Sequence, residues 1–244
     1  MIFGTLSNNN KVKKNIIGYD LIIPVYNEKN IIELIDYIVS KTKNLLKIYI
    51  CYDFDEDITL KIFKKSNYIN SQKIIFIKNS LKGPCEAIKA GISNSNAPSI
   101  IIYPADDFNN GLLLDKMHNL FIQGYDVVCP SRFIEGGLIK NCPLIKYLIV
   151  KIVSLSLFYF SKIKIKDPTN GFRMFSKKLL NKHPIESKVG FAYSLELLVK
   201  AKKNNFKIIE IPSVWIERKD RKSSFKILKW SHEYLKWFFY ALLY

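Results

Sequence analysis

The stretch YDLIIPVYNE, residues 19–28, decides the fold class. Residues 19–25 are mostly apolar, which is typical of a strand buried on both faces of a sheet, and polar residues follow them. Residues 30–43 then show the apolar spacing of an amphipathic helix. A buried strand that leads through a short polar turn into a helix is the unit from which parallel α/β sheets are built.

The same alternation continues through the first half of the chain and changes after residue 132. Further strands are expected over residues 47–52, 73–78, 99–103 and 126–130, with helices over 58–65, 84–94 and 112–123. The second part shows an apolar helix over 144–161, a polar loop over 166–173, a helix over 194–204 and a last strand over 207–216. This pattern predicts an α/β fold with a mostly parallel central sheet flanked by helices.

The composition is strongly basic and half apolar. Among 244 residues, 38 are Lys or Arg and 21 are Asp or Glu, so the formal net charge is +17, while 48% are hydrophobic. That apolar content excludes a disordered basic tail. We expect a flexible segment over residues 1–18, an α/β domain over 19–226 and an amphipathic C-terminal helix over 227–244. The four cysteines form no C-x-x-C pair, so they indicate neither a zinc site nor a disulfide framework and favour a cytoplasmic setting.

The positive charge suggests nucleic acid, an anionic membrane surface or a phosphate-bearing substrate as partner, and a coding bias is the alternative. We expect no nucleic acid, because the basic and aromatic residues form no recognised binding motif. We also expect no membrane span, because charges interrupt every long apolar stretch. The C-terminal part places cations before aromatic residues, which suits an anionic membrane surface. These residues are Arg218, Lys219, Arg221, Lys222, Lys226 and Lys229, then Trp230, Trp237 and Phe238.

Carboxylates follow three of the predicted strands in this otherwise basic chain. They are Glu28 after the first strand, Asp53, Asp55, Glu56 and Asp57 after the second, and Asp106 and Asp107 after the fourth. Ligands of open α/β sheets bind beyond the carboxyl ends of the strands, so these loops are expected to converge. Such carboxylates could hold a divalent metal that neutralises a diphosphate, although Asp57 could simply cap the next helix. The sequence contains neither a P-loop nor a G-x-G-x-x-G motif.

Taken together, the motifs resemble the family 2 glycosyltransferases of GT-A fold, in particular the polyprenyl-phosphate branch that resembles dolichol-phosphate mannose synthase. The resemblance extends from about Leu21 to Phe225. Its motifs are Pro24-Val25-Tyr26-Asn27-Glu28, Asp53 to Thr59, Lys82-Gly83 with Ala87 and Gly91, Pro104-Ala105-Asp106-Asp107, Ser131-Arg132, Asp167 to Arg173, and Glu210-Ile211-Pro212 with Arg218 and Ser223.

The resemblance implies transfer of a hexose from a nucleotide-diphosphate sugar to a polyprenyl (dolichyl or undecaprenyl) phosphate at the cytoplasmic face of a membrane. The enzyme would be peripheral and could act together with an integral-membrane partner. The implied donor-binding residues are Pro24, Val25, Tyr26, Glu28, Asp53, Lys82 and Gly83. Asp106 and Asp107 would hold Mg²⁺ or Mn²⁺, with Asp53 as a further candidate ligand. Arg132, Arg173 and Arg218, which we expect in loops, would bind the acceptor phosphate and stabilise charge in the transition state.

The chain departs from the family pattern at three places. Pro104 replaces the first Asp of the usual D-x-D metal motif, Phe54 and Asp55 replace Gly-Ser, and Ser224 replaces a common Lys. These departures leave open a membrane-associated pseudoenzyme, and the charge alone leaves open a nucleic-acid-binding protein.

A sugar or lipid hydroxyl is the alternative acceptor. Glu196 could then serve as a general base, but its spacing to Lys200 favours an i,i+4 ion pair within a helix.

Overall fold

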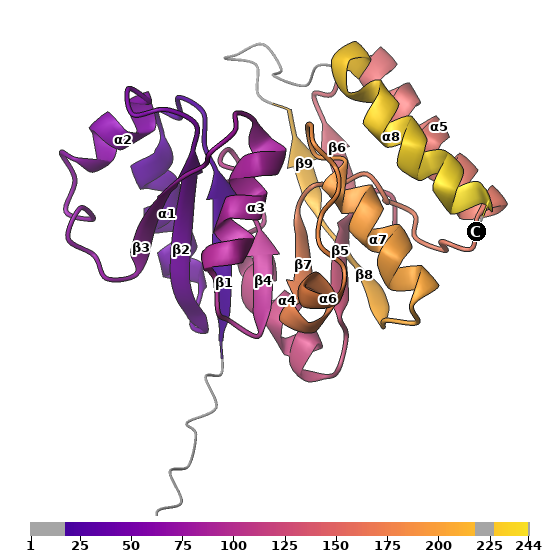
Figure 1. Ribbon diagram of the computed structural model, residues 1–244, viewed down its shortest axis with the longest axis horizontal. Coiled ribbons are helices and arrows are strands. Elements are labelled where there is room, and N and C mark those ends of the chain that lie inside the picture. Colours follow the sequence, from indigo (N-terminus) through magenta and orange to yellow (C-terminus); the bar gives the residue numbers. More distant parts are fainter. Residues whose placement is uncertain (1–17, 218–226, 244) are drawn as a thin grey trace, which may run out of the picture.

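The computed structural model describes residues 18–217 and 227–243 and contains a seven-stranded sheet in the order β3-β2-β1-β4-β7-β5-β8 (Figure 1). The strands are β1 (Tyr19–Pro24), β2 (Leu45–Tyr52), β3 (Ile74–Lys78), β4 (Ser99–Ile102), β5 (Val127–Ser131), β7 (Arg173–Ser176) and β8 (Ile208–Pro212). All neighbouring pairs are parallel except those of β7, which runs antiparallel to β4 and β5. The prediction of a mostly parallel sheet is therefore confirmed.

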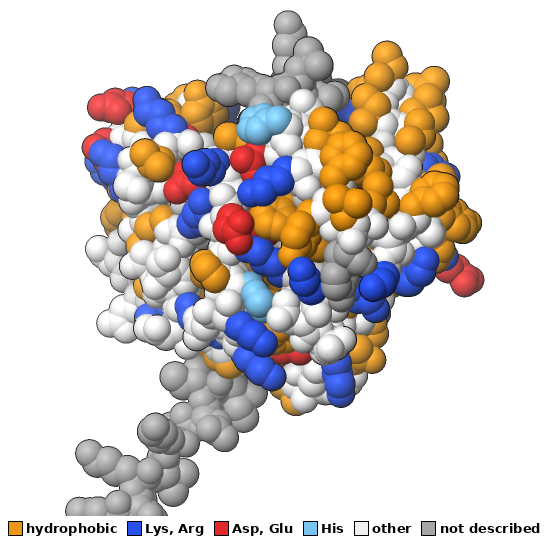
Figure 2. Space-filling view, turned by 45° about the vertical axis from the view of Figure 1, so that its right-hand side comes forward, with side chains coloured by type: hydrophobic (Ala, Val, Ile, Leu, Met, Phe, Trp, Pro, Cys, Tyr) orange, Lys and Arg blue, Asp and Glu red, His pale blue; other side chains and the backbone are white. Residues whose placement is uncertain are grey.

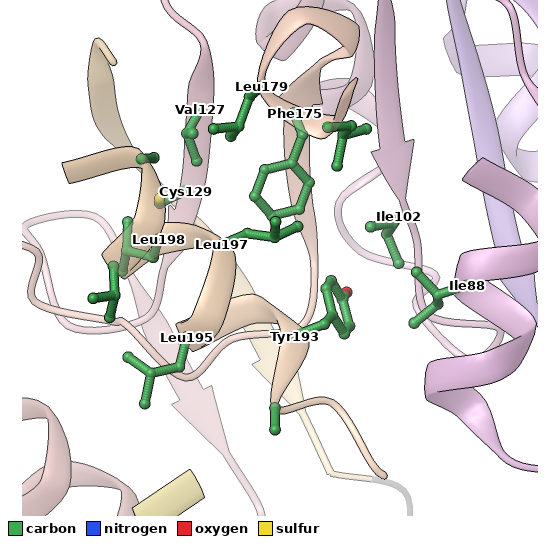
Figure 3. Close-up of a cluster of buried hydrophobic side chains, with 14 of the residues drawn as sticks. Ile88, Ile102, Val127, Cys129, Phe175, Leu179, Tyr193, Leu195, Leu197 and Leu198 are labelled. Atoms are coloured by element: carbon green, nitrogen blue, oxygen red, sulfur yellow. The ribbon is translucent and has the colours of Figure 1, made fainter. Parts of the chain in front are cut away.

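Helices cover both faces of this sheet. They are α1 (Ile31–Lys41), α2 (Ile58–Phe63), α3 (Pro84–Asn94), α4 (Gly111–Ile122), α5 (Leu144–Phe160), α6 (Lys177–Lys182), α7 (Tyr193–Lys203) and α8 (Ile227–Leu243). One buried cluster joins the sheet to α1, α2 and α4, and another joins it to α3, α5, α6, α7 and α8. Figure 3 shows the second cluster, where Ile88 of α3, Ile102 of β4 and Tyr193 of α7 lie in one layer.

The continuous apolar runs of the central strands are explained by burial on both faces. In β4, Ile100 and Ile102 belong to one cluster, whereas Ile101 belongs to the other. Side chains alternate between the faces of a strand, so both sets of positions must be apolar when helices cover both faces.

The expected last strand over residues 207–216 is two strands. β8 ends at Pro212 and pairs with β5, whereas β9 (Val214–Ile216) pairs with β6 (Leu138–Lys140) in a separate two-stranded sheet. Ser213 between them donates its backbone N–H to the Ser131 carbonyl. The strands β6 and β7 and the helix α6 were not expected, because each is short and carries only two apolar residues.

Helix α3 lies close to the sheet because the residue of α3 that faces β1 and β2 is a glycine, Gly91. A Cβ on Gly91 would lie 2.7 Å from Cγ2 of Ile22 and 2.9 Å from Sγ of Cys51. The bounds of α3 agree with the expected helix over residues 84–94.

The C-terminal helix α8 is present and lies beside α5 and α7 (Figure 1). Trp237 and Ala241 face the core, and the Trp237 indole N–H donates to Oγ of Ser187 at 2.8 Å. Within residues 18–217 and 227–243, no helix is long and apolar enough to cross a bilayer. The expected flexible segment lies, apart from Gly18, outside the described residues, as do Arg218, Arg221 and Ser224.

Candidate active site

The loop after β1 places one exposed and two buried residues of the predicted donor site. Pro24 ends β1 and Val25 is buried, with its backbone N–H bonded to the Cys51 carbonyl of β2. Tyr26 is 61% exposed, and its ring packs edge-on against Phe54 at 5.7 Å between centroids. Glu28 is buried, and its backbone N–H donates to Oγ1 of Thr59 at 2.9 Å. The structure thus brings the first and second predicted loops together.

Asn27 and Asp57 bind these two loops to each other. Asn27 adopts φ +54°, and its side-chain oxygen accepts the backbone N–H of Ile58 at 3.0 Å. The buried Asp57 caps α2 by accepting the backbone N–H of Thr59 at 2.8 Å, which confirms the capping interpretation.

Asp53 connects the end of β2 to the start of α3. Its carboxylate accepts the side-chain N–H of Asn79 at 2.7 Å and the backbone N–H of Gly83 at 3.0 Å. Gly83 has φ +113°, a conformation that favours glycine because other residues carry a Cβ. Lys82 is exposed beside this turn. Asn79 was not predicted as a site residue, because its connection to the site is the contact with Asp53, which the sequence does not show.

Asp107 and Asp106 follow β4 and have different environments. Asp107 accepts the backbone N–H groups of Asn109 and Asn110 at 2.8 and 3.0 Å, and it also accepts the Asn110 side-chain N–H at 2.6 Å. Burial raises the pKa of Asp107 above its usual value. Asp106 is half-buried beside it. Among the described residues, no group of three or more His, Cys, Asp or Glu side chains could hold a metal ion.

Arg132 follows β5 and is held by Asp167. Its Nε and Nη2 donate to the two Asp167 carboxylate oxygens at 2.7 Å each, and its backbone N–H donates to the same carboxylate at 2.9 Å. The guanidinium also lies over the Trp215 ring at 5.0 Å. Burial alone would lower the pKa of Arg132, but the Asp167 carboxylate outweighs it and raises the pKa, so the group remains charged.

Arg173 does not lie in a loop as expected: it is the first residue of β7 and is fully buried. Its guanidinium donates to the carbonyls of Asn170 and Asp167 at 2.8 Å each and to Sγ of Cys129 at 2.9 Å. It therefore braces the loop over residues 166–173 from inside and is not placed to meet a ligand in solvent. The sequence motif identified Arg173 by its residue type but could not show that its side chain is buried. Arg218 lies outside the described residues.

A cavity of about 540 Å³ lies between Arg132 and α5. Its polar lining comes from Arg132, Lys151 and Lys166, with Ser154, whose buried Oγ has no hydrogen-bond partner. Leu155, Phe158 and Tyr159 of α5 give it an apolar wall. Sequence reasoning named Arg132 as a ligand of the acceptor phosphate but missed Lys151, Ser154 and Lys166. The available signal was that Lys151 and Ser154, three residues apart on one side of a mostly apolar helix, are polar.

Glu196 forms the ion pair that its spacing suggested. It is fully buried in α7, and one of its oxygens lies 2.6 Å from Nζ of Lys200. The carboxylate also accepts the backbone N–H groups of Glu186 and Ser187. These contacts support a structural role for Glu196 instead of a general base.

The fold and the carboxylate-rich edge of the sheet define a transferase fold of the GT-A type. Residues 20–184, more than half of the chain, match glycosyl transferase family 2, and the chain belongs to this family. Among solved structures, glucosyl-3-phosphoglycerate synthase from Mycobacterium tuberculosis, in complex with Mn²⁺, UDP-glucose and phosphoglyceric acid, has a TM-score of 0.69 at 13% identity. The match covers 92% of this chain and 79% of that one and shows the likeness in fold.

Two curated relatives are more similar in sequence. The chain is 25% identical over 229 residues to a dolichol-phosphate mannosyltransferase of Pyrococcus furiosus, with 89% of this chain and 63% of the relative covered. It is 23% identical over 227 residues to a polyprenol monophosphomannose synthase of Mycolicibacterium smegmatis, with coverages of 86% and 85%. The chain therefore spans less than two thirds of the length of the Pyrococcus furiosus relative.

Proposed function

We propose that this chain transfers a hexose from a nucleotide-diphosphate sugar to a polyprenyl phosphate at the cytoplasmic face of a membrane. The observation that carries the proposal is the cavity beside Arg132, which combines cations with an apolar wall. Leu155 and Tyr159 line this cavity and are also 45% and 66% exposed on the outer face of α5. A phosphate with a long hydrocarbon chain fits both parts of such a site. The names of the two curated relatives support the same acceptor class.

The donor is proposed to bind at the opposite, carboxylate-rich part of the sheet edge. Tyr26, with Phe54 beside it, offers an exposed aromatic surface for the nucleobase. Val25 and Glu28 would contact the nucleoside, with Pro24 beside them, and Lys82 and Gly83 would border the diphosphate. Asp53, which holds the Gly83 N–H, would lie next to the same diphosphate.

Asp106 and Asp107 fit a divalent cation of the Mg²⁺ or Mn²⁺ type. Such hard cations prefer oxygen ligands, and Mg²⁺ is commonly held by one or two carboxylates together with substrate phosphates. The half-buried Asp106 and the oriented carboxylate of Asp107 supply this donor set, while Pro104 leaves the first position of the motif without a ligand. A bound cation would neutralise charge on the departing diphosphate.

The acceptor phosphate is proposed to act as the nucleophile itself. One of its oxygens forms a bond to the anomeric carbon, and the bond from that carbon to the diphosphate breaks, so the nucleoside diphosphate leaves with the electron pair. A phosphate ester is already anionic near neutral pH, so a strong general base is unnecessary. Arg132 would hold this phosphate with Lys151 and Lys166, and Arg218 remains a proposed further contact.

The outer faces of α5 and α8 are proposed to dock on an anionic membrane. Apolar side chains gather on this side of the molecule, with cations near them (Figure 2). The cytoplasmic leaflet is negatively charged, which favours the neighbouring Lys162, Lys164 and Lys236. The exposed apolar residues are Leu144, Ile145, Leu148, Ile149, Ile152, Leu155, Tyr159 and Phe160 of α5 and Leu235, Phe239, Tyr240 and Leu243 of α8.

The test is a transfer assay with Mn²⁺, a panel of labelled nucleotide sugars and vesicles that contain undecaprenyl or dolichyl phosphate. We expect lipid-linked label with at least one donor, and loss of that label in Arg132→Gln. Label on a sugar or lipid hydroxyl would replace the proposed acceptor. Donor binding without transfer to any acceptor would indicate a pseudoenzyme.

A further inference from the structure

Glu210 is a carboxylate of β8 whose contacts lead to the proposed acceptor site. It lies opposite Cys129 of β5 in the register of the sheet. One of its oxygens accepts the backbone N–H of Lys166 at 2.9 Å, and the other accepts the backbone N–H of Asp167 at 3.1 Å. A single side chain from the sheet therefore holds two successive peptide groups of the loop over residues 166–173.

Asp167 is consequently fixed at three points. Glu210 accepts its N–H, Arg173 donates to its carbonyl at 2.8 Å, and Arg132 donates to its carboxylate. The side chain of Asp167 is fully buried, so no water competes for these bonds. The orientation of Asp167 in turn sets the plane of the Arg132 guanidinium. A guanidinium has five N–H donors, and the two given to Asp167 leave others for phosphate oxygens.

We propose that Glu210 is a positioning residue for the acceptor phosphate, because Glu210 fixes the two cations that would flank this phosphate. It fixes Arg132 through Asp167, and it fixes Lys166 by accepting the Lys166 backbone N–H. This inference rests on the proposed function of the cavity. Arg132 and Lys166 line the cavity, whereas Glu210 is not among its lining residues. Glu210 thus acts through other groups and does not touch the phosphate.

The role requires a carboxylate. Glutamine has nearly the same shape, but its side-chain amide carries one acceptor oxygen and one NH₂ group, which donates. In Glu210→Gln, one of the two backbone N–H groups would face another donor. The turn at Lys166 and Asp167 would then shift or lose a bond, and the Arg132 guanidinium would lose its fixed plane.

The first test separates the acceptor from the donor in steady-state kinetics of the full chain. Glu210→Gln is expected to raise the KM for polyprenyl phosphate about tenfold, which is the effect of losing one charge-assisted bond between Arg132 and the phosphate. The KM for the nucleotide sugar should change less than twofold. Glu33→Gln, an exposed glutamate on α1, is the matched control and should leave both values unchanged. An acceptor KM within twofold of the wild type, or an equal rise for both substrates, would overturn the proposal.

The second test needs no substrate and decides the link from Glu210 to Arg132 by itself. Hydrogen exchange at Nε of Arg132 can be followed by ¹⁵N NMR, with the signal assigned through its loss in Arg132→Lys. We expect at least tenfold faster exchange in Glu210→Gln and no change in Glu33→Gln. Unchanged exchange contradicts the positioning role even if the enzyme transfers sugar. Absence of lipid-linked product in the wild type contradicts the proposed function instead.

Discussion

The backbone N–H of Asn27 donates to both carboxylate oxygens of Asp57, at 3.1 Å each. In return, the side-chain oxygen of Asn27 accepts the backbone N–H of Ile58. These bonds in both directions join the loop after β1 to the first turn of α2. The loop that carries Tyr26 therefore depends on a buried carboxylate 30 residues away along the chain.

Asp57→Ala is expected to lower the free energy of unfolding by about 2 kcal/mol. It removes the cap of α2, which is worth about 1 kcal/mol, and it leaves the Asn27 N–H without its acceptor. Urea denaturation measures the loss. Asp55→Ala is the matched control, because Asp55 is exposed two residues away, and it should change stability by less than about 0.5 kcal/mol. Equal losses in the two variants would contradict the role of Asp57.

Tyr26→Ala is expected to weaken binding of the nucleoside diphosphate about tenfold without loss of stability. The ring is exposed, and stacking of a base on an aromatic side chain is worth about 1–3 kcal/mol. Calorimetric titration with a panel of nucleoside diphosphates and Mn²⁺ gives the dissociation constants. Tyr159→Ala removes an equally exposed tyrosine from α5 and should leave these constants unchanged. Wild-type affinity in Tyr26→Ala would remove this residue from the donor site.

Asp106 and Asp107 are expected to respond differently to substitution by Asn. Asp106→Asn should reduce Mn²⁺-dependent binding of the nucleoside diphosphate at least tenfold while the melting temperature stays near that of the wild type. Asp107→Asn should reduce the same binding and also cost about 1 kcal/mol of stability, because it disturbs the bonds to Asn109 and Asn110. Removal of metal with EDTA should lower the affinity of the wild type for the nucleoside diphosphate to that of Asp106→Asn. Full Mn²⁺ dependence in Asp106→Asn would refute the metal assignment.

The sequence predicted the elements whose signal is local. Pro at the first turn and a regular apolar spacing defined α3, and the capping role of Asp57 followed from its place before a helix. The antiparallel strand β7 escaped prediction because only Met174 and Phe175 of its four residues are apolar. Its place between β4 and β5 depends on pairings with distant segments.

The places of the candidate site residues were predictable where a strand end marks them and not where burial decides their contacts. Asp106 and Arg132 follow strands β4 and β5, so residue type and position were enough to select them as candidates. The burial of Arg173 and the contacts of Glu210 depend on how the loop over residues 166–173 folds onto the sheet. Lys151 and Ser154 form part of a cavity only because α5 packs near Arg132.

His118 is expected to make stability fall as the pH drops below about 6.5. Burial lowers its pKa in the folded state, so the unfolded chain takes up a proton first. The contribution of neutral His118 to the free energy of unfolding is complete above the unfolded-state pKa of about 6.5. It is lost as the pH falls toward the lower pKa of the folded state, and the slope is no more than about 1.4 kcal/mol per pH unit. Urea denaturation between pH 7 and 5 should show a smaller decline for His118→Gln than for the wild type. His232→Gln on the exposed side of α8 is the control, and parallel declines for all three proteins would contradict the prediction.

Membrane docking through α5 is expected to fail when a charge is placed on its outer face. Ile152 is 61% exposed there, and Ile152→Asp should reduce binding to anionic vesicles at least tenfold, because it replaces an inserting side chain with one that the lipid charge repels. Leu112→Asp changes an equally exposed residue on α4 and should leave vesicle binding intact.

Vesicle sedimentation measures this binding, with nucleoside diphosphate affinity as the check that Ile152→Asp is folded. Deletion of α8 would be a poorer test, because Trp237 and Ala241 belong to the core and their loss would unfold the neighbouring helices. Raising the salt from 0.1 to 1 M should weaken the wild type's binding, since the screening length shortens from about 10 to about 3 Å. Equal loss in Leu112→Asp, or full binding by Ile152→Asp, would place the membrane contact on another face.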